Sequence, residues 1–197
     1  MNEPLEGSIA EPLISRDRLN ERLDELASEL TATLPTSGER PPLLIGVLKG
    51  STLFLADLIR RMQVDLAVDF MSISTYASQS GVVRIIKDLD TDVRGRDVVI
   101  VEDIVDTGLS LNYLRKTLGE RGPGSLQAVT LLDKVARRIV PVPVEHRGFE
   151  IPDVFVLGYG LDFQGRYRNV REILAVKDIA TLANDPLGLV RPLFGRS

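Results

Sequence analysis

Apolar residues between residues 15 and 34 recur at the spacing of one helix face. They are one, three or four positions apart: Leu19, Leu23, Leu26, Ala27, Leu30 and Leu34. This spacing predicts an amphipathic helix that begins at Ser15, whose hydroxyl suits an N-cap, and that ends before Pro35. Residues 1–14 contain Gly and Pro but no such period, and they are predicted to form a flexible N-terminal arm.

Short apolar segments alternate with helical ones in the next hundred residues. Strands are predicted over 43–48, 66–74, 82–89, 98–103 and 127–133. Helices are predicted over 51–62 and 111–122. Buried strands that alternate with helices of about 12 residues are typical of βαβ units, in which helices cover both faces of a parallel sheet.

The last third of the chain has a different pattern. Its strand candidates are shorter and lie among prolines, over 139–144, 153–159 and 172–176. Residues 178–197 have only weak periodicity and are predicted to be a C-terminal extension. The pattern as a whole predicts one α/β domain over residues 1–197, with a central mostly parallel sheet flanked by helices and a small peripheral lobe.

Composition narrows the chemistry that the chain can perform. The 197 residues are 44% hydrophobic and carry 24 Lys+Arg against 28 Asp+Glu, a net charge of −4, as in an ordinary globular protein. The absence of Cys excludes a disulfide scaffold, a zinc finger, an iron–sulfur site and a cysteine nucleophile. The single histidine, His146, excludes a multi-histidine metal site and weakens any His-based triad. The acidic balance argues against nucleic-acid binding.

Neither a targeting segment nor a membrane span is predicted. Glu3, Glu6 and Glu11 precede any long apolar run, which a signal peptide would not allow. The purest apolar stretch, 43–48, is far shorter than the roughly 20 residues that a membrane helix needs. The default expectation is a cytoplasmic protein without a membrane partner.

The most informative window covers residues 98–111. An apolar strand runs into Glu102 and Asp103, and after two further apolar residues the segment Asp106–Ser110 leads into a helix. Ligands of open α/β sheets bind where strands end and helices begin. Free N–H groups and the helix dipole favour a phosphate there, and Gly108 lets the backbone approach it. The two upstream carboxylates suit sugar hydroxyls and Mg²⁺.

Capping is the ordinary explanation for single residues of this window. Thr107 or Ser110 alone is explained as well by helix capping as by ligand binding. The complete string of two acids, two apolar residues and Asp-Thr-Gly is hard to explain in that way. The other common phosphate motifs, G-x-x-x-x-G-K-[ST] and a strand followed by G-x-G-x-x-G, are absent from the sequence.

This acidic pair with its Asp-Thr-Gly loop resembles the signature with which type I phosphoribosyltransferases bind phosphoribosyl pyrophosphate (PRPP). Four more segments, in the same order along the chain, are similar to the hypoxanthine (hypoxanthine-guanine) phosphoribosyltransferase family. They are LKGS (48–51), Thr75-Tyr76, LLDKVARR (131–138) and PDVFVLGYGLDFQGRYRN (152–169). The resemblance covers roughly residues 43–177. It implies the type I fold with a small hood lobe.

The resemblance also implies an activity. It is purine salvage, in which the phosphoribosyl group of PRPP passes to hypoxanthine and/or guanine and gives IMP or GMP and pyrophosphate. Asp106 matches the general base. The residues that match PRPP and phosphate contacts are Lys49, Gly50, Asp106, Thr107, Gly108, Leu109, Ser110 and Arg168. Those that match purine or nucleotide contacts are Glu102, Lys134, Phe155, Val156 and Asp162. The lid loop is matched by Thr75 and Tyr76, and the Mg²⁺ ligands by Glu102, Asp103 and Asp162.

Some of these residues have simpler interpretations beside the functional one. Lys49 at a strand end can be a solvated charge, Lys134 can be a surface lysine, and Phe155 by itself would be assigned to the core. The chain departs from the family pattern at His146-Arg147, where more apolar residues are expected. His146 is interpreted as structural or surface, without a role in the reaction.

Two alternative functions stay open. A PRPP-sensing regulator on the same fold would need a basic face or an added nucleic-acid-binding domain, and the net charge of −4 counts against it. A xanthine- or guanine-preferring transferase would differ in its base contacts and not in its PRPP loop. The family also implies a homodimer or a homotetramer.

Overall fold

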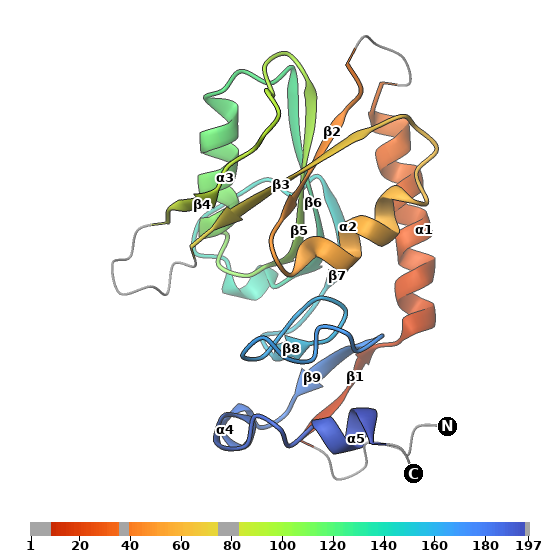
Figure 1. Ribbon diagram of the computed structural model, residues 1–197, viewed down its shortest axis with the longest axis vertical. Helices are drawn as coiled ribbons and strands as arrows, with labels where there is room; N and C mark the ends of the chain where they lie inside the picture. The colour runs from red at the N-terminus through yellow and green to blue at the C-terminus, as the bar shows by residue number, and fades with distance from the viewer. Residues whose placement is uncertain (1–8, 36–39, 75–82, 196–197) are drawn as a thin grey trace. The chain divides into compact units, whose positions relative to one another are not determined.

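The computed structural model describes residues 9–35, 40–74 and 83–195 of the chain (Figure 1). The chain forms two compact units. The larger unit is Arg22–Pro152, and the smaller unit combines Met1–Glu21 with Asp153–Ser197. The smaller unit combines segments from both ends of the sequence, and a single domain over residues 1–197 stays a prediction.

The larger unit is built on a six-stranded sheet with the order β4-β3-β2-β5-β6-β7. All neighbouring strands are parallel except β3 and β4. The strands are β2 (Leu43–Val47), β3 (Ala67–Ile73), β4 (Ile85–Lys87), β5 (Asp97–Val105), β6 (Ser125–Asp133) and β7 (His146–Glu150). The predicted mostly parallel sheet is confirmed.

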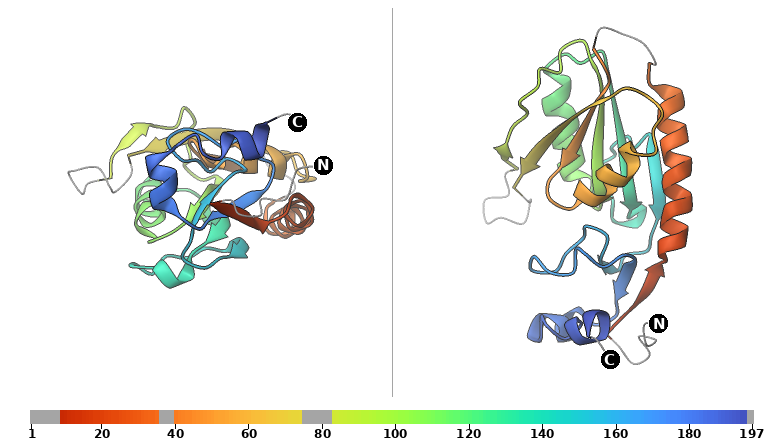
Figure 2. Two further views of the ribbon diagram at one scale, coloured as in Figure 1. Left: turned by 90° about the horizontal axis from the view of Figure 1, so that it is seen from below. Right: turned by 45° about the vertical axis from the view of Figure 1, so that its right-hand side comes forward.

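Helices cover both faces of this sheet. Helices α1 (Arg16–Thr33) and α2 (Ser51–Ile59) lie on one face and α3 (Leu109–Gly119) on the other (Figure 2). The six apolar positions predicted for the first helix are all buried, with at most 5% exposure. Ser15 is its cap, because its Oγ accepts a hydrogen bond from Arg18 N at 3.3 Å.

The order of the strands reverses between β2 and β5. From β2 the chain continues outward to β3 and β4, and from β5 it continues in the other direction to β6 and β7. Open α/β sheets bind ligands at the carboxyl ends of the strands beside such a switch point. The loops that leave β2 and β5 are the two that the sequence analysis identified as phosphate-binding candidates, 48–51 and 106–110.

The smaller unit has a three-stranded antiparallel sheet of order β1-β9-β8. It consists of β1 (Ala10–Ile14), β8 (Phe155–Leu157) and β9 (Ile173–Val176), followed by α4 (Ile179–Asn184) and α5 (Val190–Phe194). The prediction of a flexible arm is therefore wrong for residues 10–14, because pairing with β9 supplies the order that local periodicity did not show. The C-terminal extension is also structural, since Leu182 and Leu189 are fully buried in the core of this unit.

The strand predicted over 139–144 is absent, and β7 forms a few residues later. Pro141 and Pro143 have no N–H group to donate to a neighbouring strand, so the apolar residues between them lie in a loop. His146 begins β7 and pairs with Val129 of β6. Its Nε2 lies 3.0 Å from Gln127 Oε1, which agrees with a structural histidine.

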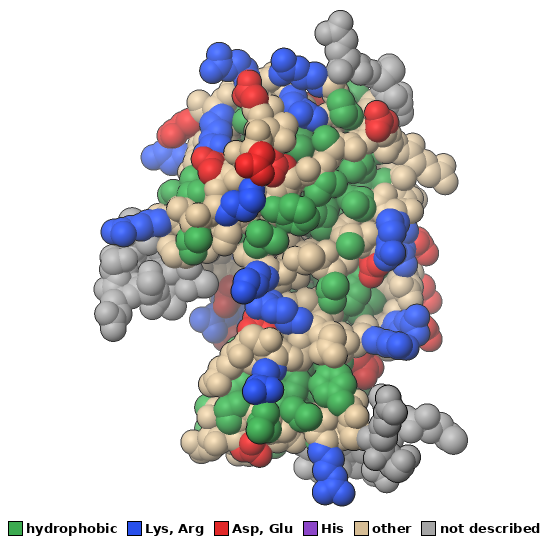
Figure 3. Space-filling view, viewed as in Figure 1, with side chains coloured by type: hydrophobic (Ala, Val, Ile, Leu, Met, Phe, Trp, Pro, Cys, Tyr) green, Lys and Arg blue, Asp and Glu red, His purple; other side chains and the backbone are tan. Residues whose placement is uncertain are grey.

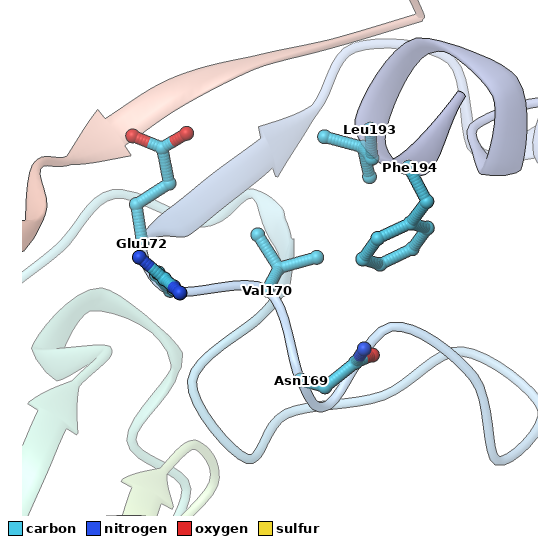
Figure 4. Close-up of a pocket in the computed structure, with 6 residues that line it drawn as sticks. Asn169, Val170, Glu172, Leu193 and Phe194 are labelled. Carbon is cyan, nitrogen blue, oxygen red and sulfur yellow. The ribbon is translucent and has the colours of Figure 1, made fainter. Parts of the chain in front are cut away.

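A pocket in the smaller unit was not predicted. It has a volume of about 390 Å³ and is lined by residues 169–172 together with Leu193 and Phe194 of α5. The two α5 side chains lie opposite Val170 (Figure 4). None of these six residues was a predicted site residue.

Hydrophobic side chains gather on the face of the larger unit where β3 and α2 lie (Figure 3). Leu53 of α2 and Val68 of β3 are among the exposed apolar residues, at 39% and 36% exposure. None of the helices within the described part of the chain combines the length and the apolar character needed to cross a bilayer.

Glu145, just before β7, stabilises the larger unit by a charge-assisted contact. Its two carboxylate oxygens accept hydrogen bonds from Arg115 at 2.8 and 3.0 Å, and Oε2 also accepts one from Ala128 N at 2.8 Å. Burial acts to raise the pKa of Glu145, but these bonds outweigh it and hold the pKa below its ordinary value.

We therefore expect the Glu145→Gln variant to lose stability at neutral pH and not in acid. A depressed pKa in the folded state stabilises the fold above the unfolded-state pKa of about 4.3, and this contribution disappears as the pH falls through the folded-state value. In urea unfolding at pH 7, the free energy of unfolding should fall by about 1 kcal/mol. The loss is no larger because the ion pair is partly exposed to solvent. Below the folded-state pKa the difference should vanish. Exposed Glu150→Gln is the control, and equal losses in both variants would contradict the assignment.

Candidate active site

The loop after β2 leads directly into α2. Its Leu48–Lys49 peptide bond is cis. The Ser51 hydroxyl donates a hydrogen bond to the Val47 carbonyl at 2.7 Å, and the Thr52 hydroxyl donates one to the Lys49 carbonyl at 2.7 Å. These bonds fix the main chain of the loop, whereas Lys49 itself is exposed. The predicted phosphate-binding lysine therefore stands on a tightly held loop.

Gly50 allows the loop after β2 to lie close against the Asp103 side chain of β5. A Cβ atom at residue 50 would lie 1.6 Å from Asp103 Oδ2 and 2.5 Å from the carboxylate carbon. Any other residue type would therefore force the Asp103 carboxylate or the loop backbone to move. The Asp103 carboxylate, whose Oδ1 accepts a hydrogen bond from Ile104 N at 3.0 Å, thus rests on the backbone of the LKGS loop. The structure brings these two predicted site segments together.

Glu102 and Asp103 differ in their surroundings although they are adjacent. Glu102 is buried at 6% exposure, whereas Asp103 is half-buried. Burial raises the pKa of Glu102 well above its ordinary value, and the neighbouring Asp103 carboxylate raises it further. A buried carboxylate beside a second one favours a cation or hydrogen-bond donors from a ligand.

The Asp106–Ser110 segment forms the start of α3. Gly108 is the N-cap at φ +83°, and as a glycine it has no side chain to cap the helix. Thr107 Oγ1 accepts only a long hydrogen bond from Leu109 N, at 3.4 Å. Capping by these hydroxyls is thus limited to this one long bond of Thr107, and the next N–H groups of the helix start, those of Ser110 and Leu111, can meet an anion. Glu102, residues 104–108, Ser110 and Leu111 line a hollow of about 90 Å³.

Lys134 follows β6 and is buried, at 6% exposure. Its main-chain N–H donates to the Val105 carbonyl at 2.9 Å, so its backbone lies beside the end of β5. The interpretation of Lys134 as a surface lysine is wrong, because a lysine of this low exposure is not solvated. The structure therefore places the Lys134 backbone next to the end of β5, where the Asp106–Ser110 segment begins.

A group of charged side chains around this loop was not predicted from the sequence. Arg137 Nε lies 2.8 Å from Asp106 Oδ1, and Arg138 Nη1 donates to the Asp106 carbonyl at 3.0 Å. Arg138 also pairs with Asp133, which is fully buried, and Arg147 Nε lies 2.6 Å from the other Asp133 oxygen. The adjacent arginines in LLDKVARR were the available signal, but only the fold determines which carboxylates they meet.

The predicted base-contact residues Phe155 and Val156 lie in β8 of the smaller unit. Phe155 is 38% exposed and makes an edge-to-face contact with Phe163, with ring centroids 5.8 Å apart. The aromatic face is thus available for stacking and is not part of the core. Val156 is buried, and its strand is an outer strand of its sheet.

Asp162 and Arg168, assigned to separate ligand contacts, are paired with each other. Arg168 Nη2 lies 2.6 Å from Asp162 Oδ1, and Arg168 Nη1 donates to the Gly160 carbonyl at 2.6 Å. Asp162 Oδ2 accepts a hydrogen bond from Gly165 N at 2.6 Å. The two side chains therefore hold one compact turn in the smaller unit.

The predicted lid residues Thr75 and Tyr76 lie outside the described residues. Within the described ranges, no group of three or more His, Cys, Asp or Glu side chains could hold a metal ion without other ligands. Mg²⁺ commonly binds through one or two carboxylates together with substrate phosphates and water. The adjacent carboxylates of Glu102 and Asp103 fit that mode of binding, and a site made wholly of protein groups is not needed.

Comparisons with known proteins agree with this arrangement. Residues 15–164 match the phosphoribosyl transferase domain family. The chain is 45% identical over 176 residues to the hypoxanthine-guanine phosphoribosyltransferase of Bacillus subtilis, which covers 88% of this chain and 96% of that protein. A crystal structure of a hypoxanthine phosphoribosyltransferase from Staphylococcus aureus has a TM-score of 0.81 at 38% identity, and the match covers 90% of this chain and 96% of that one.

A longer relative also matches. The bifunctional protein TilS/HprT of Listeria innocua is 46% identical over 179 residues, which cover 89% of this chain. The chain spans about a quarter of that protein, because the match covers 27% of its length. The family match, the identity to relatives of the same length and the loops at the switch point agree. The chain therefore belongs to the type I phosphoribosyltransferases and, within them, to the hypoxanthine phosphoribosyltransferase family.

Proposed function

We propose that this chain transfers the phosphoribosyl group of PRPP to hypoxanthine and/or guanine, and so forms IMP or GMP and releases pyrophosphate. This is a purine-salvage reaction. The observation that carries the proposal is the uncapped start of α3 at the switch point, with the Glu102–Asp103 carboxylates beside it. An anion-binding helix end next to two acids suits a substrate that combines phosphates with a ribose.

The transferase reaction breaks the bond between C1 of the ribose and the pyrophosphate oxygen, and a purine ring nitrogen forms the new bond. The transition state resembles an oxocarbenium ion, so its charges must be met by fixed groups. In our proposal the N–H groups and hydroxyls of Thr107–Ser110 hold the 5′-phosphate. Glu102 and Asp103 lie under the ribose hydroxyls.

We assign Asp106 as the general base. The attacking purine nitrogen must lose or share its proton, and a carboxylate at hydrogen-bond distance accepts it. Asp106 stands at the end of β5 with its side chain 41% exposed, so a ligand can reach it. Arg137 Nε lies 2.8 Å from its Oδ1 and so meets only one of its two carboxylate oxygens.

We assign the pyrophosphate to Lys49, Gly50 and Arg168. The exposed Lys49 ammonium and the Arg168 guanidinium neutralise its charge. We assign the purine ring to Phe155 by stacking and to Lys134, whose ammonium donates to the 6-oxygen. An adenine amino group does not accept that hydrogen bond equally well, which favours 6-oxopurines. The main chain of Val156 and the Asp162 carboxylate meet the base edge.

We propose Mg²⁺ as the metal, with Glu102 and Asp103 as the carboxylates at one position and Asp162 as the carboxylate at a second. Bound there, Mg²⁺ neutralises charge on the leaving pyrophosphate. The donor set supports this, because hard carboxylate oxygens are the ligands that Mg²⁺ prefers.

The proposal has three further parts. By resemblance to the family, we assign Thr75 and Tyr76 the role of excluding water, which would otherwise hydrolyse PRPP. A homodimer or homotetramer agrees with the exposed apolar face on β3 and α2. A cytoplasmic location stays a prediction.

A base panel tests the proposed function. The purified chain is incubated with Mg²⁺, PRPP and one of hypoxanthine, guanine, xanthine, adenine or uracil, and nucleotide formation is followed by chromatography. We expect IMP and GMP, and turnover of adenine at least 100-fold lower, because Lys134 discriminates by a hydrogen bond that adenine cannot accept. A folded protein that forms no IMP and no GMP would contradict the proposal. Preference for xanthine would identify the related transferase instead.

A further inference from the structure

Asp106 is held from two sides by consecutive arginines of the segment after β6. Arg137 approaches its carboxylate at 2.8 Å, whereas Arg138 donates to its main-chain carbonyl at 3.0 Å. The side chains of Arg137 and Asp106 are 45% and 41% exposed, so solvent screens the contact between them. The Arg138 side chain is only 16% exposed, and its contact determines where the backbone of the loop lies.

Arg138 is in turn anchored on Asp133, the last residue of β6. The Asp133 side chain has no exposed surface, and its Oδ1 pairs with Arg138 Nη2. Arg147 Nε of β7 lies 2.6 Å from Oδ2. A buried carboxylate held by two guanidiniums is a rigid support. If either arginine moved away, the negative charge of Asp133 would be less well compensated in a site of low dielectric constant. The Arg138 guanidinium thus connects Asp133 at the end of β6 to the Asp106 backbone.

The chain around Arg138 follows the same loop. Ile139 N donates to the Thr107 carbonyl at 2.9 Å. A Cβ atom on Gly108 would lie 2.8 Å from Arg138 Cδ and 3.0 Å from the Val140 carbonyl. The segment from Arg138 to Val140 therefore packs directly on the phosphate-binding segment, so that a displacement on one side moves the other.

We propose that Arg138 is a positioning residue for the Asp106–Ser110 loop, held in place by Asp133 with Arg147 as the second counter-charge. The inference rests on the proposed function, in which that loop binds the 5′-phosphate of PRPP and presents Asp106. Arg138 touches neither substrate in this proposal. Arg138 fixes the position of the N–H groups at the helix start relative to the ends of β5 and β6. Phosphate binding then does not have to bear the entropic cost of ordering the loop.

Arg147 explains the departure from the family pattern at His146-Arg147. An arginine on β7 adds a second positive charge to the buried Asp133, and its own side chain is 43% exposed. Its loss would leave the Asp133–Arg138 pair intact. We therefore expect an Arg147→Met variant to lose stability while its affinity for PRPP changes by less than about twofold, a smaller change than the loss of a hydrogen bond at the site would cause.

The test compares Arg138→Gln with Arg115→Gln in the full chain. Arg115 is the matched control, because it is 18% exposed, pairs with Glu145 in the same unit and lies within α3, five residues beyond Ser110. PRPP affinity in Mg²⁺ is measured by calorimetry, and amide hydrogen exchange is measured over residues 105–111. We expect Arg138→Gln to weaken PRPP binding about 10-fold and to speed exchange in that segment, by the loss of about one hydrogen bond to a charged group. Arg115→Gln should change the melting temperature only.

Arg138→Lys is the milder variant. If Arg138→Gln does not fold, Arg138→Lys tests whether Arg138 positions the Asp106–Ser110 loop. A lysine cannot bond Asp133 and the Asp106 carbonyl in the same fork geometry, so we expect an intermediate loss of affinity. Wild-type affinity and exchange in Arg138→Lys or in Arg138→Gln would overturn the proposal, as would equal effects in the Arg115 variant. Because these readouts need no purine, a chain that binds PRPP but transfers it to no base would contradict the proposed function and leave this inference standing.

Discussion

The Asp106→Asn variant should lose most of its turnover and keep its affinity for PRPP. The amide has nearly the shape of the carboxylate but cannot accept the proton of the purine nitrogen, and loss of a general base lowers kcat by about 10²–10⁴-fold. PRPP binding should persist because the helix start holds the phosphate with main-chain N–H groups, and Arg138 still bonds the Asp106 carbonyl. Steady-state kinetics with hypoxanthine and calorimetry with PRPP measure the two effects.

Asp88→Asn is the control for this variant. Asp88 also forms an ion pair with an arginine, Arg121, at 2.8 Å and with 50% of its side chain exposed. Its loss removes a comparable surface pair at a site remote from the loop. We expect kcat within about twofold of wild type for Asp88→Asn, as for most exposed ion pairs. Unchanged turnover in Asp106→Asn would remove Asp106 from the role of general base.

The Gly50→Ala variant should be nearly inactive although it changes one hydrogen atom to a methyl group. The new Cβ would lie 1.6 Å from Asp103 Oδ2, so either the carboxylate or the LKGS loop must move. A displacement of about 1 Å in a reactive geometry lowers the rate by roughly 10²-fold. We expect kcat/KM for PRPP to fall by about that factor, measured at saturating Mg²⁺.

Gly119→Ala is the control for the general effect of adding a Cβ atom at a glycine position. Residue 119 ends α3, and a Cβ there meets nothing within 4 Å. We expect that variant to have wild-type kinetics and equal or slightly higher stability, because alanine is the better helix former. If Gly50→Ala retained full activity, the contact between the LKGS loop and Asp103 would not be needed for the reaction.

Much of the fold could be predicted because its signals are local. The spacing of apolar residues places α1, and the alternation of apolar strands with helices predicts a parallel sheet. The errors came from elements that depend on distant partners. β1 has no period of its own and exists through pairing with β9, and β7 forms after the prolines of 139–144 instead of among them.

The candidate site was predicted only in its motif residues. Lys49, Gly50 and the Asp106–Ser110 loop follow from short motifs with a physical basis in backbone N–H groups and small side chains. Asp133 and Arg147 could not be found in this way, since they are 14 positions apart in the sequence and each is an ordinary charged residue by itself. Their pairing depends on the register of β6 and β7, which places Arg147 opposite Thr130.

The sequence by itself determined the chemistry that the chain can supply: carboxylates and a glycine at a strand end, lysines and arginines for phosphates, and neither a cysteine nor a histidine cluster. The tertiary structure decided which of these groups meet. It placed the Asp103 carboxylate on Gly50, left the start of α3 without a side-chain cap, and buried Asp133 between two arginines. The physical reason is that residue type fixes charge and hydrogen-bonding capacity, whereas burial and contact depend on strand order and register, which join segments far apart in the chain.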